Sequence, residues 1–551
     1  MATISHSSLG KLQGVSKGDV TQFWGIKYAS LGHRFGTPEI YAGQASDTVD
    51  ATKVGPATIG IPDACQAEYG LIQRSLPTPQ LPPPSDTECL NLNITIPASA
   101  SARTGLPIVV FIHGGALAMG SANWPQYDFA PLVQRSIKLG KPFIGVSINY
   151  RTGIFGFLTS EELRAAGFKA NNGLRDQKVA LQWIKKNIAG FGGNPDEVSV
   201  LGQSAGGGKI PNLQPPSIVL ANIVNLAVSA TLQLQSNEPL FKRMVNLSGT
   251  CLLLRPLPTF VHEMFYSGVC EAHGLDKLSG EERVKAIEKI SSLDLFLKVP
   301  PFIPSLPVLD RDFITAAPTF ASAEDWSNSS KPELAGLEWC KEIIIGDSQM
   351  DGNIYQLALG HRIPGIGKEF GESLKRNITG NHKEVDQLLA EYGISSAKDD
   401  QSAYFAILEL GNDICFYLPE ETFARNWPGP TYVYHLNEPN PWDGPFKGQC
   451  THIFDVALLF KNFDQHLDSS AKAVGEKLGD SIIEFVSGQA PWQATTKDKP
   501  VAWVLGGAAG IGRLMEDKPE KVGRRTAMFD YKDTIGWDTL HEAYTAFLGG
   551  R

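Results

Sequence analysis

Ser204 lies at the centre of a five-residue pattern that can carry out nucleophilic chemistry. A β-type run, residues 198–201, ends at Gly202, and the pattern GQSAG (202–206) follows at once. G-x-S-x-G directly after a strand is typical of a nucleophile elbow, a strained strand-to-helix turn that holds the serine Oγ clear of the sheet. Gly202 and Gly206 suit the turn because a Cβ at either position would collide with the neighbouring strand and helix. The pattern alone also fits a surface turn, so its surroundings decide between the two.

The segment before the elbow points to a family. It contains NGLRDQ (residues 172–177), ALQWI (180–184) and FGGNP (191–195). From Asn172 to Gly206 the chain resembles the type-B carboxylesterase and lipase family, which includes the cholinesterases, and a weaker likeness extends from about Gly14 to at least Phe460. The resemblance implies an α/β-hydrolase fold and a serine hydrolase of carboxylic esters.

His452 is the predicted general base. The family carries its catalytic histidine just after a glycine, with an acidic residue three positions later, and the stretch GQCTHIFD (448–455) matches this pattern. His435 is the runner-up, although it reads as the end of a buried strand. The alternative for His452 is a structural role, as a histidine that is only hydrogen-bonded within a loop.

Asp351 is the predicted acid of the triad. The chain order of this fold is nucleophile, then acid, then histidine. An isoleucine-rich strand ends at Gly346, and Asp351 follows five residues later, before a glycine. The family places its acid at this offset, usually as glutamate, so the aspartate here is one methylene shorter. Asp347 is the competitor for the same role, which is to hold the tautomer of the imidazole and stabilise the imidazolium.

Backbone N–H groups are the predicted donors to the oxyanion. Ala205, which follows the nucleophile, gives one of them. The resemblance implies that Gly115 and Ala116 give the others, since they stand at the second and third glycines of the family's His/Tyr-Gly-Gly-Gly motif. Alanine keeps the N–H but adds a methyl group on the acyl side of the pocket, so we expect it to restrict bulky acyl groups without abolishing catalysis.

The remaining sequence predicts an α/β architecture. Residues 1–60 read as short strands and turns, and the apolar runs 107–112 and 142–149 suit buried parallel strands. Strands and helices then alternate, as in a doubly wound sheet. Helical patterns within 260–297 and 368–410 predict excursions over the carboxyl edge of that sheet, so residues 1–551 are predicted to form one domain. The proline-rich segment 66–87 cannot form the long amphipathic lid helix of family lipases.

Composition limits the kinds of binding partner and the cellular compartment that we expect. A formal net charge of −9 and a pI near 5.7 argue against nucleic acid and anionic membranes as partners. No apolar run approaches the length of a spanning helix, and the N-terminus shows no signal-peptide pattern, so we expect a cytoplasmic protein. No metal-binding or nucleotide-binding motif is present, which predicts no cofactor and no metal. The expected partner is a small-molecule ester.

Cysteines and charge pairs give three further predictions. The odd count of seven cysteines without a secretory signal favours thiols. However, Cys65 and Cys89 occupy the positions of the family's first disulfide, so that bridge stays open as an alternative. The resemblance also implies two buried ion pairs, the first between Arg34 and Glu88. The second is between Arg151 and Asp176.

Residues 208–227 interrupt the pattern expected after an elbow. The serine should open a helix, but GKIPNLQPP (208–216) contains three prolines that would break it. Without residues 208–227 the sequence becomes GQSAGGVSATLQLQS, small residues followed by a good helix, as in the family. Possible codons allow a splice donor at Gly208-Lys209, a branch-point-like sequence at residues 220–222 and an acceptor at Ala227-Val228. We therefore hypothesise that these residues are a translated, unspliced intron; the alternative is a genuine loop insertion.

The leading functional prediction is a carboxylic-ester hydrolase that acts on small-molecule esters or lactones through an acyl-serine intermediate. A true lipase is the alternative within enzymes, made less attractive by the missing lid helix. A non-catalytic, adhesion-type member of the family is the alternative outside enzymes. Such members lose triad residues and are secreted, and the sequence shows neither feature.

Overall fold

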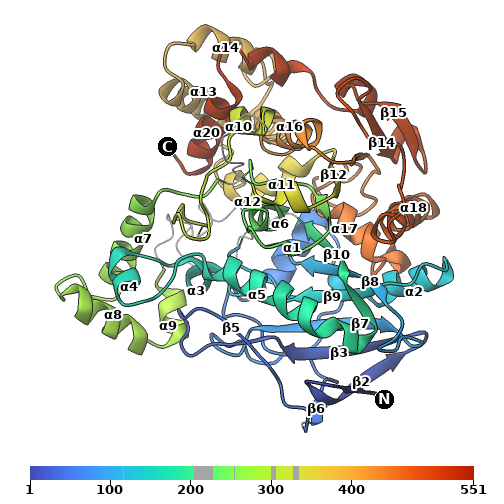
Figure 1. Cartoon of the computed structure of the whole chain (residues 1–551). Coiled ribbons are helices and arrows are strands. Elements are labelled where there is room, and N and C mark those ends of the chain that lie inside the picture. The colour runs from blue at the N-terminus through green and yellow to red at the C-terminus, as the bar shows by residue number, and fades with distance from the viewer. Residues whose placement is uncertain (47, 116, 204–226, 254, 300–305, 327–333) are drawn as a thin grey trace.

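A large twisted sheet with helices on both faces organises the chain (Figure 1). The computed structural model describes residues 1–46, 48–115, 117–203, 227–253, 255–299, 306–326 and 334–551. Ser204, Ala205, Ala116 and the segment 208–226 therefore lie outside the described residues. Among the described helices, none is both long enough and apolar enough to cross a membrane.

The main sheet contains thirteen strands within the described residues. Their order is β1-β2-β3-β7-β9-β8-β10-β11-β12-β13-β14-β15, with β6 paired to β2. The seven strands from β9 to β14 in this order are parallel, and the strands outside them at both edges pair antiparallel, apart from β6. The strands of the main sheet are β1 (Ala2–His6), β2 (Gly10–Lys17), β3 (Val20–Lys27), β6 (Thr48–Asp50), β7 (Asn91–Pro97), β8 (Leu106–Ile112), β9 (Ile144–Ile148), β10 (Gly193–Gln203), β11 (Arg243–Leu247), β12 (Glu342–Ser348), β13 (Thr431–Leu436), β14 (Val501–Leu505) and β15 (Arg513–Glu516). A separate pair is formed by β4 (Ala29–Ser30) and β5 (Glu39–Ile40).

The apolar runs of the sequence become the central strands. The run predicted at 107–112 is β8, and the run predicted at 142–149 contains β9, in which every residue is buried. The run that precedes the elbow is the end of β10, whose last six residues are all buried. Burial on both faces explains the continuous apolar patterns, because such strands have no solvent side to make polar.

Two groups of helices cover the sheet. On one face, α2 (Ala130–Lys138), α17 (Phe454–Phe460) and α18 (Ser469–Val486) pack together, and α18 contacts β8 and β10. On the other face, α5 (Asn172–Asn187) packs against α3 (Gly153–Phe157), α6 (Ala227–Gln233) and β10. The described helix that follows β10 in the chain is thus α6, which packs back onto that strand.

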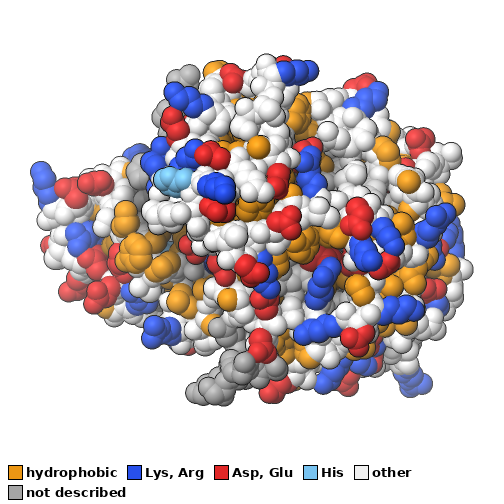
Figure 2. All heavy atoms as spheres, turned by 90° about the horizontal axis from the view of Figure 1, so that it is seen from above, with side chains coloured by type: hydrophobic (Ala, Val, Ile, Leu, Met, Phe, Trp, Pro, Cys, Tyr) orange, Lys and Arg blue, Asp and Glu red, His pale blue; other side chains and the backbone are white. Residues whose placement is uncertain are grey.

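Further helices extend beyond the sheet, where helical excursions were predicted (Figure 1). The stretch within 260–297 forms α7 (Thr259–Ala272), α8 (Gly280–Lys289) and α9 (Ser292–Leu297). Their apolar side chains pack with Phe35 and with residues of 154–163 in a second, smaller apolar cluster. The stretch within 368–410 forms most of α13 (Ile366–Asn377), α14 (His382–Glu391) and α15 (Asp400–Asn412). Seen from above, acidic and basic side chains are intermixed over the whole visible face (Figure 2).

The other helices are short or lie near the C-terminus. They are α1 (Ala64–Ile72), α4 (Glu161–Ala165), α10 (Phe320–Glu324), α11 (Gly336–Trp339), α12 (Gln356–Leu359), α16 (Leu418–Asn426), α19 (Pro519–Val522) and α20 (Trp537–Leu548). Helix α1 ends at Ile72, and no helix follows it before β7. The proline-rich segment therefore forms no long helix, as predicted.

Candidate active site

Three strand ends bring the predicted site segments together. Strand β10 ends at Gln203, directly before Ser204, and its Gly202 pairs with Ile112, the last residue of β8. The glycine-rich loop that begins at His113 follows β8 directly. Strand β12 ends at Ser348, three residues before Asp351. Because all three strands are parallel, the residues that follow them meet at one edge of the sheet.

Asp351 and His452 form a hydrogen bond although 101 residues separate them. The distance from His452 Nδ1 to Asp351 Oδ1 is 2.5 Å, and both side chains are fully buried. The two loops also touch through their backbones, since Met350 and Thr451 form an isolated parallel bridge in which the Met350 N–H donates to Cys450 O over 2.8 Å. The predicted base and acid are thus held side by side.

The hydrogen bonds around this pair leave one histidine nitrogen available. Asp351 Oδ2 accepts from the Ser348 N–H at 2.8 Å, and no partner for His452 Nε2 exists among the described residues. Burial lowers the pKa of His452 to about 3, so the imidazole is neutral near pH 7. Burial and the charge of Asp347 raise the pKa of Asp351, and hydrogen bonds from Ser248 and Ser348 oppose that rise. A neutral imidazole with a free Nε2 can accept a proton.

Gly115 holds a backbone conformation that requires glycine. Its φ is +111°, and a Cβ there would lie 2.3 Å from Met119 O. The Met119 N–H donates back to Gly115 O at 2.8 Å, which closes a tight turn. Tyr150 anchors the start of this loop, because its hydroxyl donates to His113 O and its ring stacks on the imidazole at 4.5 Å. A loop fixed in this way can present backbone N–H groups to a reacting carbonyl.

Comparison with known proteins decides the family. Residues 2–505 match the Carboxylesterase family.

The chain belongs to the carboxylesterase family.

Among curated relatives, Lipase 1 of Yarrowia lipolytica is 35% identical over 507 residues, which cover 89% of this chain and 88% of that protein. Lipase 3 of the same organism is 28% identical over 501 residues, covering 87% and 86%. The carboxylesterase of Geobacillus stearothermophilus matches with a TM-score of 0.71 at 22% identity, over 95% of this chain and 99% of that one. The fold is thus the α/β-hydrolase fold, and the family makes the protein a serine hydrolase.

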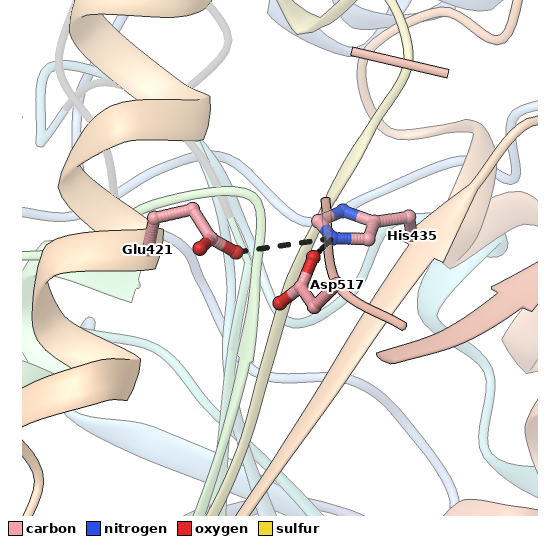
Figure 3. A group of neighbouring side chains, drawn as sticks. All are labelled: Glu421, His435 and Asp517. Carbon is pink, nitrogen blue, oxygen red and sulfur yellow. Dashed lines mark hydrogen bonds and ion pairs between the residues drawn. The ribbon is translucent and has the colours of Figure 1, made fainter. Parts of the chain in front are cut away.

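In this carboxylesterase the two runners-up, His435 and Asp347, pair with each other. His435 Nδ1 lies 2.7 Å from Asp347 Oδ1. On the other side of the ring, His435 Nε2 lies 3.2 Å from Asp517 Oδ1, as Figure 3 shows. Although burial opposes the shift, Asp347 and Asp517 raise the pKa of His435 to about 9. An imidazolium with a carboxylate at each nitrogen cannot act as a general base, so the geometry favours His452.

Asp347 is also occupied on its other side. Arg524 donates from Nε to Asp347 Oδ2 at 2.8 Å and from a terminal nitrogen to Oδ1 at 2.6 Å. Burial raises the pKa of Asp347, but the charges of Arg524 and His435 outweigh it and bring the pKa to about 2. The geometry therefore favours Asp351 as the acid that faces His452.

Glu421, His435 and Asp517 could in principle hold a metal ion. Their ligand atoms lie within 4.8 Å of one another, and all three side chains are buried. Arg425 binds the Glu421 carboxylate at 2.6 Å, and the imidazolium adds a second positive charge. Burial and the charge of Asp517 raise the pKa of Glu421 to about 8, and the imidazolium of His435 pairs with Asp517. We therefore interpret the group as a buried network of ion pairs and hydrogen bonds and assign no metal to it.

The network predicts a pH-dependent stability. The pKa of His435 rises from 6.5 to about 9 on folding, so its contribution is fully present below pH 6.5 and is lost as the pH rises through 9. The shift corresponds to about 3 kcal/mol. Urea unfolding from pH 6 to pH 10 should show a larger fall in the free energy of unfolding for the wild type than for His435→Gln. Equal pH dependence of the two proteins would contradict this assignment.

One of the two predicted ion pairs of the enzyme forms, and the other does not. Arg151 and Asp176 are both fully buried and joined at 2.7 Å, as predicted. The prediction of an Arg34–Glu88 pair is wrong. Arg34 lies 3.4 Å from Asp86, whereas Glu88 binds Lys27 at 2.8 Å and is largely exposed. Lys27 stands where the family usually has proline, and this extra cation takes the carboxylate of Glu88.

Cys65 and Cys89 are buried thiols, and the disulfide between them is not formed. They lie in different surroundings. Cys65 Sγ donates to Gln126 Oε1 at 3.6 Å, whereas Cys89 lies near the buried ion pair of Arg151 and Asp176. Burial raises the pKa of both thiols to about 12, which makes them unreactive.

Sequence reasoning missed three residues beside the Asp351–His452 pair. Ser248 directly follows β11 and donates to Asp455 Oδ2 at 3.4 Å, and Tyr434 donates to the same oxygen at 3.0 Å. Asn353 accepts from the His452 N–H at 2.8 Å. Only Ser248 could have been noticed from the sequence, because a serine and a glycine follow the strand-like run of β11, as they follow that of β10.

Proposed function

We propose that the enzyme hydrolyses small-molecule carboxylic esters or lactones through an acyl-serine intermediate. The observation that carries the proposal is the 2.5 Å hydrogen bond between Asp351 and His452, whose Nε2 has no partner within the described part of the chain. This pair lies at the strand edge where β10 delivers the elbow sequence. A nucleophile, a base and an orienting acid are the groups that ester hydrolysis through a serine needs.

The residues would act in a fixed order. Ser204 Oγ attacks the ester carbonyl while its proton passes to His452 Nε2, and Asp351 stabilises the imidazolium. The N–H groups of Gly115, Ala116 and Ala205 stabilise the oxyanion, and removal of one such donor typically costs about 10²- to 10³-fold in rate. The imidazolium then protonates the departing alcohol. Water then attacks the acyl-serine and gives a proton to His452. As the bond between Ser204 Oγ and the acyl group breaks, His452 returns that proton to Ser204 Oγ and the acid leaves.

A chromogenic short-chain ester assay tests this function. The full-length protein should hydrolyse p-nitrophenyl acetate, and Ser204→Ala should not. A labelled organophosphonate should form an adduct that mass spectrometry maps to Ser204 in the wild type alone. If neither protein hydrolyses the ester and no adduct forms, the non-catalytic, adhesion-type interpretation replaces the proposal.

A lipase is the second candidate, because relatives with high coverage carry that name. In the segment where family lipases place their lid, the structure has only the nine-residue helix α1 (Ala64–Ile72), and the described residues 73–90 that follow form no helix. This argues against a long lid helix. The two candidates differ in their response to an oil–water interface. Marked activation by emulsified long-chain triglyceride would favour the lipase.

Ala116 predicts a preference for small acyl groups. The family motif implies a methyl group on the acyl side of the proposed oxyanion hole, so acetyl and propionyl esters should be hydrolysed faster than long-chain esters. We expect kcat/KM to fall about tenfold or more between p-nitrophenyl propionate and the decanoate, since loss of fit in a pocket costs about 1–3 kcal/mol. Ala116→Gly should weaken the preference. A higher kcat/KM for the long-chain ester would contradict the prediction.

A further inference from the structure

Two buried asparagines connect the end of helix α1 to the loop that carries His452. Asn353 donates from Nδ2 to Leu71 O at 3.0 Å, and its Oδ1 accepts from the His452 N–H at 2.8 Å. Asn440 donates to the next carbonyl, Ile72 O, at 2.9 Å and to Thr451 Oγ1 at 3.2 Å. Both asparagines are fully buried. Only Asn353 bonds to His452 itself.

The His452 backbone stands at a strained point of the chain. Ile453, the next residue, has a φ of +61°, a left-handed conformation that β-branched residues rarely adopt. Helix α17 begins directly after it. Strain of this kind persists only where the surrounding contacts determine the conformation. The bond from the His452 N–H to Asn353 is one such contact, and without it a buried N–H would lose its acceptor.

The short acid makes the position of His452 critical. Asp351 is one methylene shorter than the glutamate usual at this position, so its carboxylate reaches His452 only if the two loops lie close together. Two hydrogen bonds flank the contact between them. The first joins Met350 N to Cys450 O and the second joins His452 N to Asn353 Oδ1, both at 2.8 Å. These two bonds hold the loops close together and so make up for the missing methylene.

We propose that Asn353 is a positioning residue that holds His452 within reach of the Asp351 carboxylate. It sits two residues after the acid and bonds to the backbone of the base, so it ties the acid and the base together. Its second bond, to Leu71 O, fixes the asparagine against α1. The inference rests on the proposed function, because it assigns a role within the triad.

Kinetics of Asn353→Ala, with Asn440→Ala as the matched control, test the proposal. Asn353→Ala should lower kcat for p-nitrophenyl acetate about tenfold to a hundredfold, because a displacement of about 1 Å at a catalytic group has effects of this size. KM should stay within about threefold, since the loss falls on the chemical step. Asn440→Ala removes similar buried bonds to α1, so it should lower the melting temperature to a similar extent yet keep kcat within about threefold.

A rescue experiment separates positioning from stability. Asp351→Glu restores the longer acid, so the double variant Asn353→Ala/Asp351→Glu should recover at least part of the kcat lost by Asn353→Ala. Asn353→Ser serves in place of the alanine variant if that protein does not accumulate.

Three results would overturn the proposal: a kcat for Asn353→Ala within threefold of the wild type, an equal loss for Asn440→Ala, or no recovery in the double variant. The Ser204→Ala control keeps this outcome apart from the proposed function. If Ser204→Ala is inactive and Asn353→Ala is unimpaired, only the role of Asn353 fails.

Discussion

Replacing Ser204 or His452 by alanine should remove nearly all esterase activity. Each change should lower kcat by about 10⁴- to 10⁶-fold, because the members of such a triad act as a unit. KM should change little, since neither side chain is expected to bind the substrate strongly in the ground state. Stopped assays with p-nitrophenyl acetate, at enzyme concentrations high enough to detect the residual rate, provide the measurement.

The double variant Ser204→Ala/His452→Ala distinguishes a triad from two independent contributions. It should be no slower than the worse single variant, because a base without its nucleophile has nothing to activate. Additive losses would contradict the shared mechanism. Circular dichroism should show the wild-type secondary structure for the three variants at the assay temperature, which excludes unfolding as the cause.

Asp347, in β12, and Asp351, three residues after that strand, give a matched pair of variants. Asp351→Asn should lower kcat about 10⁴-fold, because an amide at this position would favour the wrong tautomer of His452. Asp347→Asn removes a buried charge that Arg524 and His435 share, so it should lower stability and leave kcat within about tenfold. If Asp351→Asn retains full activity, the acid role moves to Asp347.

The central sheet was predictable because its strands are buried on both faces. Strands β8, β9 and β10 appear in the sequence as continuous apolar runs, and their parallel neighbours follow from the alternation of strands and helices. Helix α1 was not predicted. Asp63 stands at its N-cap and is a residue type that often caps helices, but its side chain makes no capping hydrogen bond here.

The contact between Asp351 and His452 was predictable for a different reason. Chain order and local motifs identify both residues, although nothing in the sequence gives their distance. The partners of Asp455 and Asn353 could not be found in this way. Their contacts with Tyr434 and with Leu71 depend on how distant loops pack, and no local spacing records that packing.

The ion pairs show the limit of a family resemblance. Arg151 and Asp176 pair as expected, whereas Glu88 does not pair with Arg34. A family resemblance predicts which residue stands at a position. The residue with which it forms an ion pair also depends on the other charges nearby. Here one substitution, Lys27, was visible in the sequence and redirected Glu88. A charged residue that departs from the family pattern can therefore change which residues form ion pairs around it.

Deletion of residues 208–227 should raise esterase activity by about 10²-fold or more. The elbow serine should open a helix that fixes its own position and the N–H of Ala205. In this chain the helix described after β10 is α6 (Ala227–Gln233), which packs against β10. Joining Gly207 to Val228 would place that helix directly behind the elbow. Correct placement of a nucleophile and one oxyanion donor is worth about this factor.

The deletion should also stabilise the fold. Closing a loop of about 20 residues costs about 2–3 kcal/mol of chain entropy, which the shortened protein avoids. We therefore expect the melting temperature to rise by about a few degrees. Sequencing of the transcript tests the origin of the segment separately. A mature message that keeps the whole segment as its only form would exclude the intron and leave a genuine insertion.

Ser204→Ala in the deleted background is the control for the activity gain. It should return the shortened protein to the residual rate, which shows that the gain passes through the proposed nucleophile. Labelled organophosphonate should likewise react faster with the shortened protein than with the full chain, because the same elbow reacts in both assays. Equal kcat/KM and equal melting temperatures for the full-length and shortened proteins would contradict the prediction. Such a result would mean that residues 208–227 form a loop that the fold tolerates without harm to the elbow.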